Sequence, residues 1–267
     1  MTSFFYDVIF NKSYFWSPDE NNWVFPIDSF NEIFAAIQQK DDNMYHVDNP
    51  GPVNTYKTHF AEYQFKQVTS LRLHPLVAEK PELVKIESLE DFKTFAKQHM
   101  NEEVIAWDLE TSGLDFMKCR IGCITFSFDG KTGYFVAWKN VDKRLLNQML
   151  MTCKAQVGAN LKFDVRFLWK NGIPAARIDE DTVQLGHLMN EQRFNGLKSH
   201  AFYYTPFGDY DRELDRYREK TGVEDFTSIP EHILFPYATM DAVVTYLTYK
   251  ALLEQMRYID TTMPNEK

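Results

Sequence analysis

Two carboxylates lie two residues apart at the end of an apolar segment. Residues 104–110 read VIAWDLE, and the mixture of β-branched, aromatic and aliphatic residues predicts a β-strand. Residues i and i+2 of a strand face the same side, so Asp108 and Glu110 would lie next to each other. Two acids beside a core are costly unless a positive group compensates them, and a divalent cation would do so. Alone, such a pair is very weak evidence for chemistry, because paired acids are generally a turn residue and a solvated neighbour.

Two later segments add further groups that could do chemistry. Asn160 and Asp164 lie where a strand passes into a helix, so Asn160 can cap that helix while Asp164 falls in its first turn. For Asp164 alone, complementing the helix dipole is the simpler interpretation. Pro236 predicts the start of another helix, in which Tyr237 and Asp241 are four residues apart on one face. That face continues as an apolar stripe, so a buried Asp241 needs a partner.

The elements that must position these residues alternate between strands and helices. A short strand at 83–86 precedes a helix that Ser88 opens, with Asp91 three residues on as in a capping box. Further strands and helices follow along the chain. We predict strands at 104–110, 120–128 and 132–138, a helix at 143–152, a strand ending near 160, a helix at 161–169, a strand before Asp181 and irregular structure with short helices at 194–229. This order predicts an α/β layered domain.

Residues 1–85 show no sustained period, although a helix is predicted at 29–39. We expect an amino-terminal extension of unknown role at 1–85 and the functional domain at 86–267.

Charge and composition exclude some classes of protein. The net charge of −9 argues against a protein that holds nucleic acid mainly through a basic surface. It is compatible with a nuclease, because bound metal ions supply positive charge where a phosphate must lie. Three cysteines without a paired framework suit a reducing compartment, and they lack the further ligands of a zinc site. The amino terminus shows no signal sequence or membrane span, so we expect a cytoplasmic protein with no membrane partner.

Taken together, the segments IAWDLETSGLD, VGANLKFDVRFL, the Asp181-Thr182 pair and YATMDAVVTYLTYKAL resemble the exonuclease domains of the DEDD superfamily, tyrosine subclass. The resemblance spans about residues 104–256 and is greatest to the proofreading domains of A-family DNA polymerases, notably those of bacteriophages. It implies an RNase H-like fold, a mixed central sheet flanked by helices. It also implies a 3′-5′ exonuclease that releases nucleoside monophosphates from a single-stranded or frayed 3′ end of DNA.

The resemblance assigns a role to each candidate residue. Asp108, Glu110 and Asp241 would hold one Mg²⁺ or Mn²⁺ ion, while Asp108 and, through water, Asp164 would hold a second. The Tyr237 hydroxyl would orient the attacking water. Oxygen ligands suit these two metals.

Contacts to the substrate are implied for three further residues. Thr111 would touch the terminal nucleotide, Leu114 would wedge against its base, and Asn160 would either contact the strand or simply cap its helix. Phe and Tyr residues between 194 and 210 could stack on bases.

Three functions remain open. The first is the proofreading domain of a longer polymerase, whose polymerising module would be its partner. The second is a stand-alone enzyme, including an RNA-trimming exonuclease of the ribonuclease D kind. The third is a non-catalytic domain that binds nucleic acid or serves as a scaffold. The presence of all five catalytic residues that the resemblance implies favours an enzyme. The greater similarity of the motifs to those of polymerases favours the polymerase fragment.

Overall fold

The structure is a computed structural model that describes residues 15–17, 22–24 and 79–262, apart from 192–193 and 209. The chain divides into two compact units, one of residues 1–79 with 201–209 and a larger one of residues 80–200 with 210–267. In the smaller unit, β1 (Phe15–Ser17) pairs in antiparallel fashion with β2 (Asn22–Val24). The helix predicted at 29–39 lies outside the described residues.

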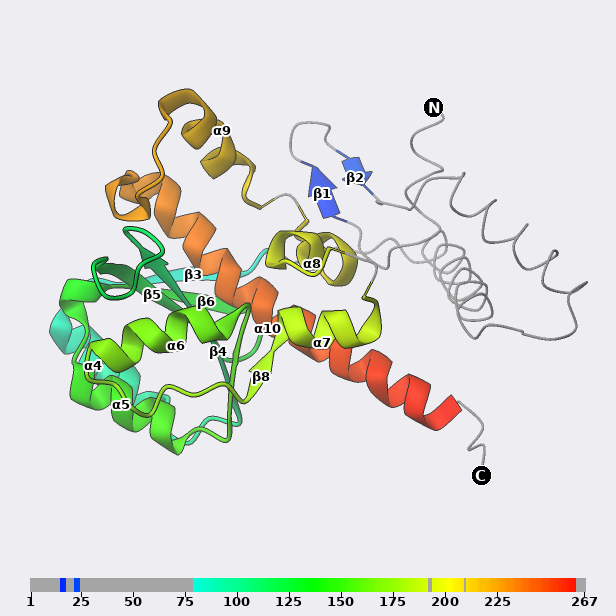
Figure 1. Cartoon of the computed structure of the whole chain (residues 1–267), viewed down its shortest axis with the longest axis horizontal. Helices are drawn as coiled ribbons and strands as arrows, with labels where there is room; N and C mark the ends of the chain where they lie inside the picture. Colours follow the sequence, from blue (N-terminus) through cyan, green and yellow to red (C-terminus); the bar gives the residue numbers. More distant parts are fainter. Residues whose placement is uncertain (1–14, 18–21, 25–78, 192–193, 209, 263–267) are drawn as a thin grey trace, which may run out of the picture. The chain divides into compact units, whose positions relative to one another are not determined.

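The larger unit is built on a mixed sheet of six strands in the order β3-β6-β5-β4-β7-β8 (Figure 1). Its central three strands, β4, β5 and β6, are antiparallel neighbours, whereas β3, β7 and β8 add in parallel at the two edges. The predicted strands are confirmed, and each begins or ends within about two residues of its predicted boundary. The strands are β3 (Glu82–Ile86), β4 (Val104–Thr111), β5 (Ile121–Ser127), β6 (Thr132–Ala137), β7 (Ala155–Gly158) and β8 (Glu180–Asp181).

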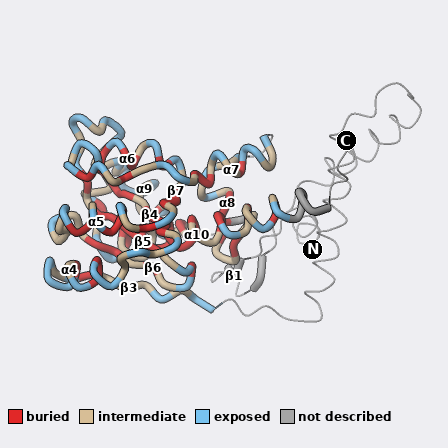
Figure 2. Tube along the Cα trace, turned by 90° about the horizontal axis from the view of Figure 1, so that it is seen from below, coloured by how far each residue is buried: buried red, intermediate tan, exposed pale blue. Residues whose placement is uncertain are grey.

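Helices cover both faces of this sheet, which makes the fold α/β as predicted. The first face carries α4 (Leu89–Gln98), α5 (Lys143–Thr152) and α6 (Leu161–Lys170), and the main hydrophobic core lies beneath them. The second face carries α10 (Glu231–Thr262), which Figure 1 shows as the long helix drawn in orange and red. The central strands appear as the buried interior in Figure 2. Strand β4, which carries Asp108 and Glu110, is therefore packed between helices on both faces of the sheet.

Strand β4 shows how the two faces divide its residues. Ile105, Trp107 and Leu109 belong to the main core, on the side of α4, α5 and α6. Ala106 instead packs in a smaller cluster that includes residues of α10. Because alternate residues of a strand face opposite sides, Asp108 and Glu110 share the face of Ala106 and lie toward α10. The strand therefore delivers its two acids to the helix that carries Asp241.

Helix α10 begins earlier than the sequence predicts. Pro236 was expected at the helix start, but it lies inside the helix, which begins at Glu231. The carbonyl of Pro230 accepts hydrogen bonds from Ile233 and Leu234 and so forms the first turn. The prediction was wrong because a proline fits the first turn of a helix well, and the sequence offers two prolines six residues apart.

A glycine allows α10 to approach the sheet closely. A Cβ atom added at Gly133 of β6 would lie 2.6 Å from the Thr239 methyl carbon and 2.9 Å from the Thr239 carbonyl oxygen. Real Cβ atoms do not approach that closely, so a side chain at Gly133 would push the helix away from the sheet. The position of Asp241, half a turn further along α10, depends on this close contact.

The helices on the first face begin as the sequence predicts. Ser88 accepts a hydrogen bond from the backbone N–H of Asp91, which confirms the predicted cap of α4, and its hydroxyl donates to the Asp91 carboxylate. Asp142 caps α5 through the backbone N–H groups of Arg144 and Leu145. At its far end α6 stops at Asn171 and Gly172, and Gly172 has the positive φ of 83° typical of a helix end.

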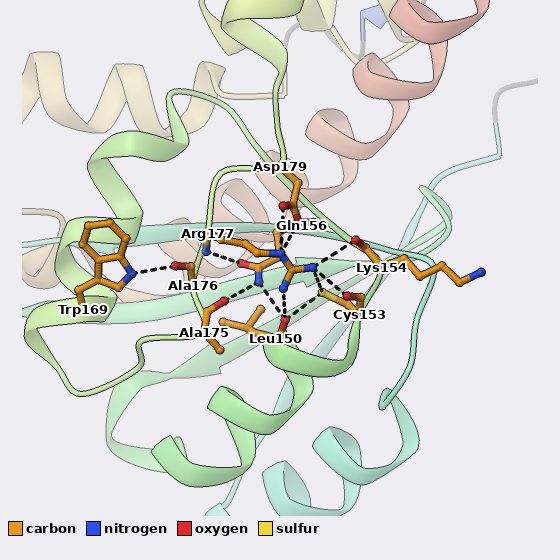
Figure 3. Close-up of polar contacts among 9 residues, drawn as sticks. All are labelled: Leu150, Cys153, Lys154, Gln156, Trp169, Ala175, Ala176, Arg177 and Asp179. Carbon is orange, nitrogen blue, oxygen red and sulfur yellow. Dashed lines mark hydrogen bonds and ion pairs between the residues drawn. The ribbon is translucent and has the colours of Figure 1, made fainter.

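A cluster of polar side chains connects the end of α5 with β7 and with the segment before β8. We call Gln156, Arg177 and Asp179 the Arg177 cluster (Figure 3). The Arg177 guanidinium donates to the carbonyls of Leu150, Cys153 and Lys154, and its Nε donates to Asp179. The buried Gln156 amide donates to the carbonyls of Leu150 and Ala175 and accepts from the Arg177 backbone N–H. Each polar side chain in this cluster has partners on neighbouring segments.

The prediction of irregular structure with short helices at 194–229 is confirmed. The segment holds α8 (Leu197–Tyr204), which contributes residues to both units, then α9 (Arg212–Thr221) and a short 3-10 turn, η2 (Phe226–Ser228). Helix α7 (Thr182–Met189) precedes it. No helix among the described residues has the length and apolar character needed to cross a membrane.

Candidate active site

Three carboxylates from two elements meet between the sheet and α10. One oxygen from each of Asp108, Glu110 and Asp241 lies within 4.8 Å of the other two. Glu110 and Asp241 are buried, with exposed fractions of 6% and 4%, whereas Asp108 is half-buried. Strand β4 supplies the first two and α10 supplies the third. The three acids that the resemblance assigns to one metal ion are therefore neighbours in the fold.

Asp164 approaches the same place from α6, on the other side of β4. It is buried and close enough to Asp108 for the two charges to repel, although it lies outside the group of three. The start of α6 is held by Asp181, whose carboxylate accepts the backbone N–H groups of Asn160 and Leu161 at 3.0 and 2.9 Å. Asp181 also caps α7 through the N–H of Val183. It thereby fixes the helix that carries Asp164.

Two tyrosines stand beside Asp241. Tyr237 lies one turn earlier on α10, as predicted, and its hydroxyl contributes to holding the Asp241 carboxylate in its charged form. Tyr210, two residues before the start of α9, donates a hydrogen bond from its hydroxyl to Oδ1 of Asp241. The two rings are stacked, with centroids 6.0 Å apart and an interplanar angle of 14°. Both phenols therefore face the acids.

Burial and mutual repulsion raise the pKa of every acid in this cluster. Burial raises the pKa of Asp108 well above its usual range, and the charges of Asp164, Asp241 and Glu110 raise it further. The pKa of Glu110 is raised by burial and then by Asp241 and Asp164. Burial raises the pKa of Asp241 to about 7, although the Tyr210 and Tyr237 hydroxyls oppose the shift.

Asp164 and the two phenols show the same influence. Burial raises the pKa of Asp164 well above its usual range, against the effect of nearby backbone N–H groups. Burial and the charge of Asp241 raise the pKa of Tyr210 and Tyr237 well above that of a free phenol. Both tyrosines are therefore neutral hydrogen-bond donors at neutral pH.

The described residues offer little positive charge to balance these acids. Arg218 lowers the pKa of Glu110 and Lys198 lowers that of Asp241, but Lys198 already forms ion pairs with Asp211 and Asp215. Buried carboxylates without compensating charge are expensive. A donor set made only of carboxylate oxygens, close together and short of positive charge, fits hard divalent cations such as Mg²⁺ or Mn²⁺. The residues present therefore fit a metal site.

The three residues expected to touch substrate lie next to this cluster in the chain. The Thr111 hydroxyl donates to the carbonyl of Gly113 at 2.9 Å and so shapes the turn after β4. Leu114, in the loop that follows, is 86% exposed. Asn160 is exposed and has a positive φ of 59°.

The capping alternative for the Asn160 side chain is wrong. This side chain makes no capping hydrogen bond, because Asp181 binds the backbone N–H groups of Asn160 and Leu161 instead. The Asn160 amide consequently stays at the surface, at the end of α6 nearest the buried Asp164.

A family model for the 3′-5′ exonuclease matches residues 83–257, which is well over half of the chain. The chain belongs to the 3′-5′ exonuclease family. The match begins in β3 and ends within α10. It therefore contains all five residues predicted to be catalytic: Asp108, Glu110, Asp164, Tyr237 and Asp241.

The chain is also similar to part of a polymerase sequence and to solved structures. The chain is 34% identical over 128 residues to the DNA polymerase of Escherichia phage T5, an alignment that covers 39% of this chain and 15% of that polymerase. The catalytic core of RRP6 from Trypanosoma brucei is 16% identical, with a TM-score of 0.50, over 92% of this chain and 61% of that one. The Nibbler EXO domain of Aedes aegypti, at 13% identity and a TM-score of 0.49, covers 70% of this chain and is itself covered to 94%. The likeness to RRP6 bears out the RNase H-like α/β fold.

Sequence reasoning did not single out Tyr210 or the capping role of Asp181. Tyr210 lies within the 194–210 segment that was expected beside the site, but many aromatic residues there offered the same signal. Asp181 was noted only as part of an Asp-Thr pair. A short strand that ends in an acid and passes directly into a helix is the signal that could have revealed its cap.

Proposed function

We propose that this protein is a two-metal 3′-5′ exonuclease that hydrolyses DNA from its 3′ end and releases nucleoside monophosphates. The observation that carries the proposal is the meeting of Asp108, Glu110 and Asp241 within 4.8 Å, in a setting short of positive charge. Membership of the 3′-5′ exonuclease family supports the direction of hydrolysis. The five catalytic residues are Asp108, Glu110, Asp164, Tyr237 and Asp241.

Each residue has a role that follows from its position. Asp108, Glu110 and Asp241 would hold one divalent cation, and Asp108 with Asp164 would hold the second. A pair of divalent cations held there would stabilise charge on the attacking and leaving oxygens and would make water a stronger nucleophile. The Tyr237 hydroxyl, which burial keeps protonated, would form a hydrogen bond that orients the attacking water. Because that phenol is neutral, it serves as a positioning group and not as the base.

Substrate contacts extend from the same elements. Thr111 and Leu114 follow directly after Glu110, so they would touch the terminal nucleotide and its base. The exposed amide of Asn160 would reach the strand at the start of α6. These contacts would hold the 3′ end of a single-stranded or frayed DNA over the carboxylates.

The role within a larger protein is proofreading for an A-family polymerase. The 34% identity to the phage T5 DNA polymerase supports this role. A polymerising module would then be the partner that delivers the strand, and a bacteriophage origin would place the protein in the cytoplasm of a bacterial host.

The test is digestion of a 5′-labelled single-stranded DNA oligonucleotide with Mg²⁺ or Mn²⁺. We expect a ladder that shortens from the 3′ end and that disappears with EDTA or in the Asp108→Ala variant. RNA of identical sequence, digested in parallel, distinguishes a DNA exonuclease from one of the ribonuclease D kind. An intact DNA oligonucleotide with both metals, in the presence of correctly folded protein, would overturn the proposal.

A separate comparison tests the proofreading role. Primer-template duplexes with either a matched or a mismatched 3′ end differ only in how readily that end frays. We expect faster removal of the mismatched nucleotide, since a single-stranded end must reach the carboxylates. Equal rates on the two duplexes would argue against proofreading while leaving the exonuclease proposal intact.

A further inference from the structure

We propose that the outer face of α6 binds the phosphates of the nucleic-acid strand whose 3′ end lies at the acidic cluster. This basic face of α6 is formed by Lys162, Arg166 and Lys170. The inference rests on the proposed function and deepens it, because it assigns a path to the part of the strand that is not being hydrolysed.

Helical spacing places the three cations in one row. Lys162, Arg166 and Lys170 are four residues apart, so they recur on one side of α6, and all three are exposed. At 1.5 Å per residue the row is about 12 Å long, and phosphates of one strand of B-DNA are spaced about 3.4 Å apart. The row is therefore long enough to meet about three phosphates.

The charge of this face differs from that of the chain. The whole protein has 29 basic and 38 acidic residues, yet the only acid in α6 is the buried Asp164 on the opposite side. None of the three cations forms an ion pair with an acid in the described part of the chain. Helix α4, by contrast, pairs Lys93 with Glu90. An uncompensated basic row on an acidic protein is what a polyanionic partner requires.

A loop connects this face to the acidic cluster. Residues 112–120 begin directly after β4 and reach α6, where the guanidinium carbon of Arg166 lies 4.1 Å from the centroid of the Phe116 ring. The Lys170 amino group donates to the carbonyl of Met117 in the same loop. The loop that contains Leu114 therefore connects β4, which carries Asp108 and Glu110, with the basic face of α6.

Apolar side chains are interleaved with these cations. Trp169 of α6 is 56% exposed, and Leu114 and Met117 of the loop are 86% and 63% exposed. Single strands are commonly held by a basic groove combined with aromatic surfaces on which bases stack. Figure 2 shows that α6 lies at the periphery of the larger unit, with exposed positions along its length. Its outer side is thus accessible to a strand.

The experiment compares strands that differ in length. A trinucleotide reaches only the acidic cluster, whereas an oligonucleotide of about twelve nucleotides also spans the basic face. Dissociation constants are measured by fluorescence anisotropy of a 5′ label in EDTA, which prevents hydrolysis, over a range of salt concentrations. The test protein carries Lys162→Gln, Arg166→Gln and Lys170→Gln. The matched control carries Lys97→Gln, Lys131→Gln and Lys139→Gln, three exposed lysines on other elements, so both variants lose the same charge.

We expect the test variant to bind the long DNA on the order of tenfold more weakly than the wild type, with the slope of log Kd against log salt reduced by about 2. The control should change Kd by less than about twofold, because its lysines are outside the proposed path. The charge-retaining pair Lys162→Arg and Lys170→Arg should keep the wild-type affinity. Lys162→Gln alone should give a smaller loss without disturbing the loop contacts of the other two.

Two results would overturn the basic face as the strand path. One is wild-type affinity of the test variant for the long strand, and the other is an equal loss in the control. Hydrolysis of the trinucleotide by wild-type protein in Mg²⁺ is measured separately. Its absence would count against the proposed function, whereas the affinity comparison in EDTA would still decide the basic face. A loss that appears with DNA but not with RNA of the same sequence would contradict recognition through phosphates.

Discussion

The Arg177 cluster and the acidic cluster both place polar side chains beside the strands of the same sheet. In the first, one cation is matched by Asp179, and the guanidinium and the Gln156 amide bond to carbonyls of neighbouring segments (Figure 3). In the second, Asp108, Glu110 and Asp241 face one another, and their pKa values are raised. A self-satisfied network strengthens the fold, whereas like charges held together weaken it unless a ligand intervenes.

This contrast separates residues that maintain the fold from residues that act on a substrate. Removing a member of the Arg177 cluster should leave carbonyls without partners and lower stability, with little effect on chemistry. Removing a member of the acidic cluster should relieve repulsion and abolish chemistry. Each of the following changes tests one side of the contrast.

The largest effect is expected for Asp108→Ala. Asp108 would contact both metal ions, so its loss removes several kcal/mol of transition-state stabilisation, which corresponds to a fall of about a thousandfold or more in turnover. In EDTA the free energy of unfolding should be unchanged or higher, because a repelling charge is gone. Single-turnover hydrolysis and urea denaturation measure the two quantities. An active variant, or one that unfolds more easily, would remove Asp108 from its assigned place.

Gln156→Leu tests the opposite side of the contrast. The substitution keeps the side-chain volume but removes two donors and one acceptor, which leaves the buried carbonyl of Leu150 with fewer partners. We expect a loss of about 2–4 kcal/mol in the free energy of unfolding, with turnover unchanged below the melting temperature. The control Gln148→Leu changes an exposed glutamine of α5 and should alter stability by less than about 0.5 kcal/mol. Equal stability of the two variants would contradict the structural role of Gln156.

Tyr237→Phe should reduce turnover by about a hundredfold and leave stability within about 1 kcal/mol of the wild type. The phenylalanine ring keeps the packing against Tyr210 and loses only the hydroxyl that orients water. Tyr134→Phe serves as the control, because its ring packs against Phe95, in the core on the other face of the sheet. Wild-type turnover in Tyr237→Phe would show that the residue serves only for packing.

The acids should also give the metal-free protein a characteristic pH dependence. Burial raises the pKa of Asp241 to about 7 in the folded state, above its value in the unfolded chain. Between the two values the folded state binds more protons, so stability falls as the pH rises from about 4 to about 7. Glu110→Gln should flatten this fall, and Mn²⁺ at pH 7 should raise the wild-type melting temperature by binding the folded state alone. A melting temperature in EDTA that rises over this range would contradict the raised pKa values.

Local signals explain why so much of the fold was predictable from sequence. The strands at 104–110 and 132–138 combine apolar residues with turn residues between them, and the Ser88 cap is a contact between near neighbours in the chain. The predicted start of α10 was wrong because Pro230 and Pro236 both fit the preference of proline for the first turn of a helix. Only packing against the sheet distinguishes the two positions. Local sequence signals therefore predict the order of the helices and strands more reliably than the residues at which they begin and end.

The site divides in the same way. The expectation that Asp108 and Glu110 lie side by side needed only the alternation of a strand, and the expectation that Tyr237 and Asp241 share a face needed only the helical repeat. The cap of α6 by Asp181 joins residues 21 and 20 positions apart, and the Tyr210 bond to Asp241 joins residues 31 apart. No periodicity or local rule encodes such contacts, since they exist only after β7 and β8 pair and α9 is placed. Tyr210 is consequently the residue on which the structure adds most to the sequence.

The smallest effect is expected for Tyr210→Phe. In this variant Asp241 of the acidic cluster loses a hydrogen-bond partner, as the carbonyls of the Arg177 cluster do when Gln156 is replaced. A group that hydrogen-bonds to a metal ligand orients that ligand, as Gln156 orients its carbonyl partners. Loss of the hydroxyl should weaken Mn²⁺ binding by about tenfold, at the lower end of what such partners contribute, while the ring stays stacked on Tyr237. Isothermal titration calorimetry of the metal alone measures this without any substrate. Unchanged or tighter Mn²⁺ binding would show that the hydroxyl does not orient Asp241, and that the carboxylates are held by their own elements without its help.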